Sequence, residues 1–104
     1  MKKILFALIV ILTVIASCSK KAVPTANKAL KHGADLYSKN CARCHGAQGV
    51  KDSRTPNLQT IPLDKEQLVN SITNGKNYMP AFGKKLSADD ISNVADLILS
   101  WHAK

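Results

Sequence analysis

Apolar residues form a nearly continuous run near the start of the chain, where residues 4–16 are interrupted only by Thr13. A cationic Met-Lys-Lys start precedes this run. Such a pattern is typical of a secretory signal, and the run is too short to span a bilayer. We therefore expect residues 1–17 to be a signal peptide that is removed from the mature chain.

After the signal, apolar positions follow the period of an amphipathic helix in three stretches. A first helix is expected over about residues 25–40, a second of about ten residues after Asp64, and a third after Ser87. Asp64 and Gln67 resemble a capping box, and Ser87 offers a second N-terminal cap. No stretch has the alternation of a β-strand, so the pattern predicts a small all-α domain over residues 25–104.

The predicted helices are separated by two loops, at residues 46–60 and 74–85, which contain Gly, Pro and Asn. Gly75 is expected to end the second helix in a left-handed conformation. The last helix carries the clearest apolar stripe, which consists of Ile91, Val94, Ala95, Ile98 and Trp101.

The apolar run ends in Ile-Ala-Ser-Cys at residues 15–18, which resembles the lipobox of bacterial lipoproteins. This resemblance implies a diacylglycerol on the Cys18 sulfur, cleavage before Cys18, and a lipid-anchored tether over residues 18–24. An uncleaved membrane helix and a signal cleaved without lipid are the alternatives. The cysteine count favours the anchor, because a second motif uses the other two and Cys18 would otherwise be a free thiol in an exported protein.

Basic residues outnumber acidic ones throughout the chain, with 15 Lys and Arg against 7 Asp and Glu and a formal charge of +8. The domain remains basic after Lys2 and Lys3 are removed with the signal. No basic run is longer than two residues, which disfavours nucleic acid as a partner of an exported domain. A basic surface instead favours acidic protein patches or anionic lipid headgroups.

Residues 41–45, Cys-Ala-Arg-Cys-His, form the attachment sequence for c-type haem. Thiols of Cys41 and Cys44 on one helical turn can add to the two haem vinyl groups, and His45 can then give the iron an imidazole nitrogen. Zinc would need four ligands in a tetrahedral array, and a thioredoxin-type dithiol would need a βαβ context. The sequence offers neither, so we expect one covalent haem c. Such a group would also stabilise a domain with a small apolar core.

Met79 is the expected sixth iron ligand, because the only other methionine is the initiator. It lies in a loop rather than on an apolar helical stripe, and Pro80 restricts it to extended backbone. His32 and His102 are the rival ligands, but both are interpreted as exposed surface residues. Ligation by His45 and Met79 would raise the potential relative to two imidazoles and leave no open position for substrate or oxygen.

Taken together, these motifs resemble a class I c-type cytochrome of the short single-haem type, over about residues 33–101. The resemblance rests on Gly33 and Tyr37, on Thr-Pro-Asn-Leu at 55–58, and on the segment 74–83 around the methionine. It implies a small cytochrome c fold in which three main helices wrap the haem and the first and last helices cross at Gly33. It also implies that the Pro56 carbonyl accepts a hydrogen bond from the ring of the haem-ligating histidine.

Two positions depart from the family pattern. Thr55 replaces the usual Gly before the proline, so that turn is expected to differ. Tyr78 stands where small residues are common, and two interpretations of its hydroxyl are open, contact with a haem propionate or simple exposure.

The expected walls of the haem pocket are Leu58, Leu63, Leu68, Ile72, Phe82 and Val94.

These features together predict an electron carrier, not an enzyme, that is exported and lipid-anchored to a bacterial membrane. The haem domain is expected to face the periplasm or the cell exterior. Its partners are expected to be redox proteins with acidic docking surfaces, such as membrane complexes, and not nucleic acid. The alternatives are a dedicated haem subunit of a larger membrane oxidoreductase and a haem sensor with a labile Met79. The basic residues expected around the haem edge are Arg43, Lys51, Lys76, Lys84 and Lys85.

Overall fold

A computed structural model describes residues 25–102 of the chain. The predicted signal at residues 1–17, the tether at 18–24 and the lipid site at Cys18 lie outside this range, as do the last two residues. The described part is all-α, as predicted, and it contains one isolated bridge between Lys76 and Met79 in place of a sheet. Its helices are α2 (Thr25–Asn40), α3 (Ala42–His45), α4 (Lys65–Asn74) and α5 (Ala88–His102).

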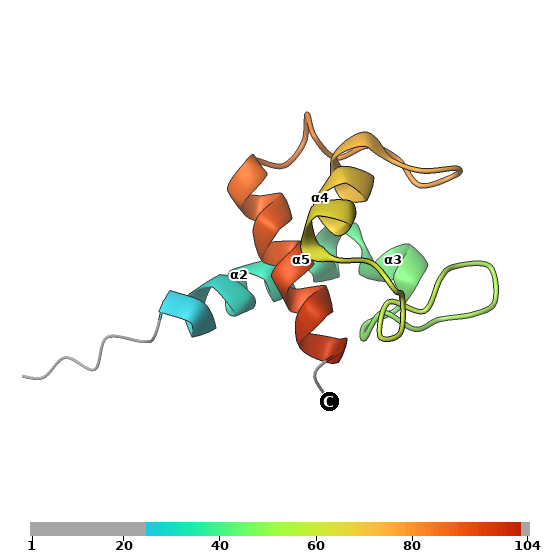
Figure 1. Ribbon diagram of the computed structural model, residues 1–104, viewed down its shortest axis with the longest axis horizontal. Coiled ribbons are helices and arrows are strands. Elements are labelled where there is room, and N and C mark those ends of the chain that lie inside the picture. Colours follow the sequence, from blue (N-terminus) through green and yellow to red (C-terminus); the bar gives the residue numbers. More distant parts are fainter. Residues whose placement is uncertain (1–24, 103–104) are drawn as a thin grey trace, which may run out of the picture.

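Helices α2 and α5 cross near the middle of the molecule, with α4 packed beside α5 and α3 at the far end of α2 (Figure 1). Gly33 allows the crossing, because a Cβ built there would lie 2.5 Å from the Asn93 carbonyl oxygen. Tyr37 and Trp101 meet edge to face across the same contact, with ring centroids 5.1 Å apart. The crossing expected from the sequence is therefore confirmed.

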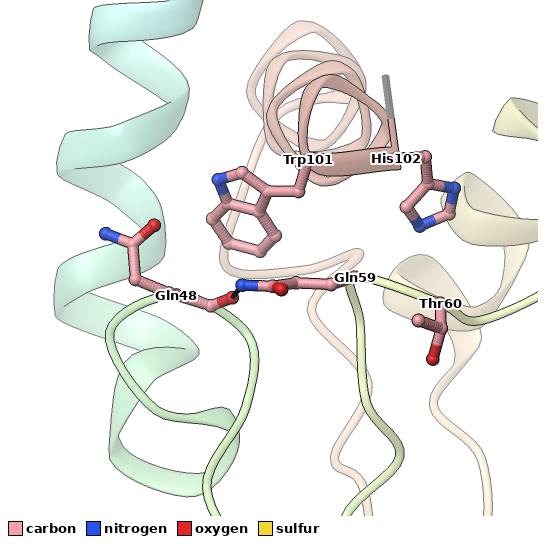
Figure 2. A pocket seen from close by; sticks show the side chains of 5 residues that line it. All are labelled: Gln48, Gln59, Thr60, Trp101 and His102. Atoms are coloured by element: carbon pink, nitrogen blue, oxygen red, sulfur yellow. Dashed lines mark hydrogen bonds between the residues drawn. The ribbon is translucent and has the colours of Figure 1, made fainter. Parts of the chain in front are cut away.

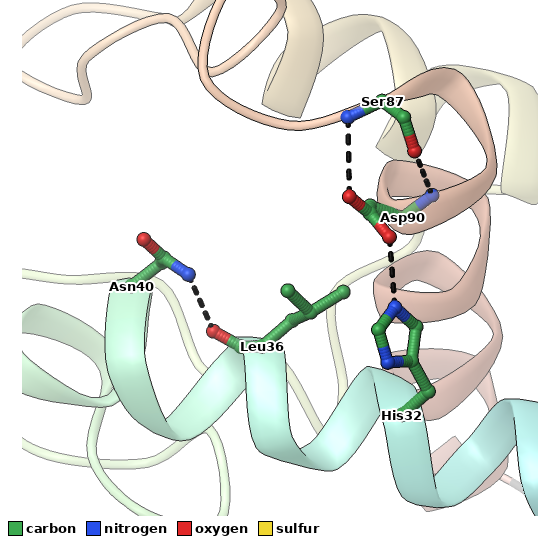
Figure 3. A network of polar contacts seen from close by, with 5 residues as sticks. All are labelled: His32, Leu36, Asn40, Ser87 and Asp90. Carbon is green, nitrogen blue, oxygen red and sulfur yellow. Dashed lines mark hydrogen bonds and ion pairs between the residues drawn. The ribbon is translucent and has the colours of Figure 1, made fainter.

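The N-terminal ends of α4 and α5 are fixed by reciprocal capping. Asp64 accepts a hydrogen bond from the Gln67 amide at 2.9 Å, and the Gln67 side chain accepts one from the Asp64 amide at 3.0 Å. Ser87 and Asp90 make the equivalent pair of bonds at the start of α5, and His32 of α2 lies 2.8 Å from the same carboxylate (Figure 3). These caps begin both helices where the sequence predicts.

Gly75 ends α4 with a positive φ of 73°, as expected, but its ψ of 168° is extended rather than left-handed helical. The chain therefore leaves the helix in an extended direction. It then returns beside the end of α4, where the Phe82 amide donates to the Ile72 carbonyl at 2.9 Å and the Gly83 amide to the Thr73 carbonyl at 3.0 Å.

The apolar core lies between the three longer helices and the loops that join them. Of the expected pocket walls, only Leu63 is half-buried rather than buried, and it packs against the same cluster. No helix among residues 25–102 is both long and apolar enough to cross a membrane. The buried hydrophobic residues are Tyr37, Cys41, Leu58, Leu68, Ile72, Phe82, Ile91, Val94, Ala95 and Ile98.

Candidate functional site

The two motif cysteines lie one turn apart where α2 passes into α3. The Cys41 amide donates to the Tyr37 carbonyl at 2.8 Å, and the His45 amide donates to the Cys41 carbonyl at 2.9 Å, so the helical path is continuous through the motif. Both thiols are free, but Cys41 is buried in the core and Cys44 is exposed. This arrangement suits a group with one edge inside the core and another at the surface.

Burial raises the pKa of the Cys41 thiol to about 11. The neighbouring thiol of Cys44 adds to this rise, and the ammonium of Lys85 opposes it. Lys85 also lies over the Phe82 ring, with its Nζ 5.9 Å from the ring centroid. A cation from the loop before α5 therefore lies close to the buried cysteine.

His45 is half-buried, and burial lowers the pKa of its ring. The nearby Pro56 carbonyl opposes this lowering of the pKa. The buried Nδ1 atom of His45 nevertheless has no partner at hydrogen-bond geometry. A lowered pKa favours the neutral imidazole, which is the form that binds a metal ion. The hydrogen bond expected between His45 and Pro56 remains a prediction.

Met79 lies at the end of a tight turn between α4 and α5. Its amide donates to the Lys76 carbonyl at 2.9 Å, and its carbonyl accepts from the Lys76 amide at 3.2 Å. Asn77 within the turn has a positive φ of 54°. The Met79 side chain is half-buried and packs against the apolar core that also contains Cys41.

A second set of contacts, which the sequence did not predict, holds the loop after His45. The Tyr37 hydroxyl donates to the Gly46 carbonyl at 2.7 Å, and the Leu58 amide donates to the Gly49 carbonyl at 2.9 Å. Gly49 has a φ of +78°, and a Cβ there would lie 2.7 Å from the Trp101 ring. These contacts fasten the loop to both crossing helices.

The interpretation of His102 as an exposed surface residue is wrong. Its ring is half-buried, and Nε2 lies 2.7 Å from the Leu58 carbonyl oxygen, 44 residues away in the chain. This contact forms because the last turn of α5 packs on the loop that carries Pro56. His32 is exposed, as expected, and its contact is the surface pair with Asp90.

The structure shows the surroundings of Thr55 and Tyr78, the two residues that depart from the family pattern. The Thr55 hydroxyl is buried without a hydrogen-bond partner, directly before Pro56. The Tyr78 side chain is 104% exposed, which favours the second interpretation of its hydroxyl, simple exposure.

A shallow pocket lies at the end of α5, beside the loop after His45 (Figure 2). The Gln59 side chain donates to the Gln48 carbonyl across its floor at 3.0 Å. None of the residues expected to hold haem is among those that line it, which are Gln48, Gln59, Thr60, Trp101 and His102.

The described residues fit a covalent haem better than a zinc ion. They provide two thiols one turn apart, a histidine whose lowered pKa favours the neutral ring, and a methionine on the same core. Among residues 25–102, no three His, Cys, Asp or Glu side chains are grouped to hold a metal ion. Zinc would need four such ligands.

Comparison with known proteins gives a consistent picture. A family model described as cytochrome C oxidase, cbb3-type, subunit III matches residues 28–98. The chain is 36% identical over 78 residues to cytochrome c6 of Diacronema lutheri, covering 68% of this chain and 94% of that protein. It is 39% identical over 74 residues to cytochrome c6 of Gloeothece citriformis, covering 65% and 67% of the two chains.

A solved structure of cytochrome c6 from the diatom Phaeodactylum tricornutum resembles the described fold with a TM-score of 0.59. The two sequences are 31% identical, and the match covers 71% of this chain and 94% of that one. The similarity therefore extends over nearly all of the smaller protein and includes the three main helices.

Proposed function

This chain belongs to the class I c-type cytochromes, as a single-haem electron carrier with a cytochrome c6-like domain and not an enzyme, and we propose that it transfers electrons while a lipid on Cys18 tethers it to a membrane. The observation that supports the carrier function is the turn from Cys41 to His45, packed on the same core as Met79. The tether is proposed from the lipobox-like sequence at residues 15–18. The family implies a covalent haem c, whose iron supplies one-electron exchange.

Each site residue has a distinct part in this proposal. Cys41 and Cys44 would hold the haem through two thioether bonds, and His45 and Met79 would bind its iron. The Pro56 carbonyl orients the His45 ring, because a ligating imidazole is held by a bond from its other nitrogen. With both of these side chains bound to the iron, no position would be left on it for a substrate.

The apolar core around the site would keep water from the iron of a bound haem. Leu68, Ile72 and Phe82 are all buried in the apolar cluster that contains Cys41. An apolar surrounding disfavours the extra charge of the ferric state and so raises the potential. Cys44, in contrast, is exposed, so the edge attached to it lies where a partner protein can approach.

The tether at residues 18–24 is short. Residues 19–24 reach at most ~20 Å when fully extended. Helix α2 follows directly and spans 16 residues, which corresponds to about 24 Å of helix. Since the haem motif follows the far end of α2, helix α3 lies away from the end of α2 at which residue 25 begins (Figure 1).

The lipid proposal is tested by replacing Cys18 with Ser in the full-length chain. Wild-type protein should incorporate radiolabelled fatty acid and remain with washed membranes. Cys18→Ser should lose the label and appear in the soluble exported fraction or keep its uncleaved signal. Equal membrane retention of both proteins, with no label on the wild type, would exclude the lipid anchor.

The basic surface supports acidic redox proteins as partners, and nucleic acid is not proposed as a partner. The periplasm or the cell exterior is proposed as the location of the haem domain, because the predicted signal directs export.

A second candidate function is a dedicated haem subunit of a larger oxidoreductase. One observation favours it, because the matching family model is described as an oxidase subunit. Purification in mild detergent separates the two. The carrier should be isolated as a single chain, whereas a subunit should co-purify with a fixed complex in constant proportion.

A further inference from the structure

Tyr78 is the most exposed large apolar side chain in the described part of the molecule. The residue is fully exposed, whereas the next large exposed hydrophobic residue, Val50, is 49% exposed. An aromatic ring entirely in water contributes no packing to its own fold. Tyrosine combines a large apolar surface with a polar hydroxyl, which makes it frequent in protein interfaces.

The backbone beneath this ring is fixed rather than loose. Reciprocal hydrogen bonds join Lys76 and Met79 on either side of the turn. Gly75 packs so closely behind it that an added Cβ would lie 2.6 Å from the Met79 carbonyl oxygen. A rigid turn presents the ring at little entropic cost to a partner.

The surroundings of Tyr78 define the chemistry of what it can contact. Pro80 and Ala81 are exposed beside it, and exposed lysines follow at both ends of the loop at 76, 84 and 85. No acidic residue occurs over residues 76–86. In Figure 1 this loop, between α4 and α5, extends along one edge of the molecule beyond the helices. The loop therefore offers an apolar centre with a cationic border.

We propose that Tyr78 is the central contact of a docking surface over residues 76–85, and that its partner is a redox protein with an apolar recess bordered by Asp and Glu. The proposal rests on the electron-carrier function and deepens it, because Tyr78 directly precedes the expected iron ligand Met79. Acidic groups of the partner pair with the lysines, and its apolar recess receives the ring.

The test measures electron transfer between the haem-loaded protein and the natural partners. Membranes and the soluble exported fraction of the source organism are mixed with wild type, Tyr78→Ala, Tyr78→Phe and, as a matched control, Val50→Ala. Tyr78→Ala should lower the second-order rate constant about threefold to tenfold, the range expected when a central interface tyrosine is truncated. Tyr78→Phe should keep most of the rate, and Val50→Ala all of it.

Two further measurements separate docking from ligation. The midpoint potential and the far-red band of methionine-ligated ferric iron should be unchanged in Tyr78→Ala. A loss of that band would assign the slower rate to Met79 and overturn the docking role. Equal rates for Tyr78→Ala and Val50→Ala would overturn the docking role of Tyr78 but not the carrier function. A wild-type protein that exchanges no electrons with these fractions would overturn both the carrier function and the docking role.

Discussion

Single residues decide how the Met79 turn is held against the core. Gly75 occupies a conformation with φ +73°, which side chains with a Cβ rarely adopt. The nearest atoms to an added Cβ are backbone atoms of Met79 and Ala81, at 2.6 and 2.9 Å. Neither can move without displacing the turn, so Gly75 controls the position of the expected iron ligand.

Gly75→Ala is predicted to destabilise the haem-loaded protein by about 1–3 kcal/mol and to weaken the far-red methionine band. Gly83→Ala is the comparison for crowding without a left-handed backbone, because a Cβ there would lie 2.9 Å from the Thr73 methyl carbon and 3.0 Å from the Thr73 carbonyl oxygen. Urea unfolding and the ferric spectrum are measured for both. An unchanged band in Gly75→Ala would show that the turn does not position the sulfur.

Lys85 is predicted to raise the midpoint potential. Its ammonium lies near the Cys41 thiol and the Phe82 ring, and a positive charge beside the haem disfavours the ferric state. Lys85→Gln should lower the potential by roughly 10–40 mV, the size expected for the Coulomb effect of one nearby charge in a partly solvated site. Lys84 is an exposed neighbouring lysine, and Lys84→Gln should leave the potential nearly unchanged. An equal shift in Lys84→Gln and Lys85→Gln would assign the effect to net charge alone.

At the scale of elements, contacts between residues close together in the chain could be predicted from the sequence, whereas contacts between distant residues could not. The capping pairs Asp64–Gln67 and Ser87–Asp90 are three residues apart, so their spacing alone predicts where α4 and α5 begin. The contact between His102 and the Leu58 carbonyl joins residues 44 apart, and no local pattern indicates it.

The candidate site shows the same limit. The attachment motif and the methionine loop are local sequences, and they could be identified directly. The burial of Cys41 against the exposure of Cys44 depends on how α2 and α5 cross, and so does the position of Gly49 under Trp101. Those features could be described only once the packing of the helices was known.

Gly33→Ala is predicted to force α2 and α5 apart. The added methyl group would lie 2.5 Å from the Asn93 carbonyl oxygen, which belongs to the α5 backbone. The expected cost is about 1–3 kcal/mol of unfolding free energy, the usual range for overpacking. Lys31→Ala, on the exposed side of α2, should change stability by less than about 0.5 kcal/mol. Similar unfolding midpoints for the two variants would contradict a close crossing.

The link between α2 and the start of α5 is predicted to depend on pH. Hydrogen bonds from His32 and from the Ser87 backbone hold the pKa of Asp90 below its usual value of 3.8. A lowered folded-state pKa adds stability above the unfolded value, and this stability is lost as the pH falls through the folded value. Asp90→Asn should therefore have a lower free energy of unfolding than wild type at pH 6, and the difference between the two free energies should narrow below pH 4. A constant difference across that range would exclude the linkage.

At the scale of the whole molecule, the haem completes a core that is otherwise small. The described residues bury ten hydrophobic side chains, one of which is Cys41 itself. Domains of this size bury a modest fraction of their surface and commonly need a covalent or metal staple. The covalent group is therefore expected to be part of the fold as well as the redox centre.

Chain made without haem attachment is predicted to lose most of its stability. Wild-type protein produced in cells that lack the cytochrome maturation apparatus has the same sequence as the matured form, so no substitution confuses the comparison. Circular dichroism should show less helix and no cooperative thermal transition. An unloaded chain with the same melting temperature as the loaded protein would show that the apolar core is sufficient alone.

The most direct test of the central claim is an optical redox titration of the purified haem domain. The account predicts a single one-electron transition, a low-spin spectrum in both states, and the far-red band that Met79 gives to ferric iron. Met79→Ala should lose this band and titrate at a lower potential. A colourless protein with both motif thiols open to alkylation, or a native ferrous form that binds carbon monoxide, would contradict an iron held between His45 and Met79.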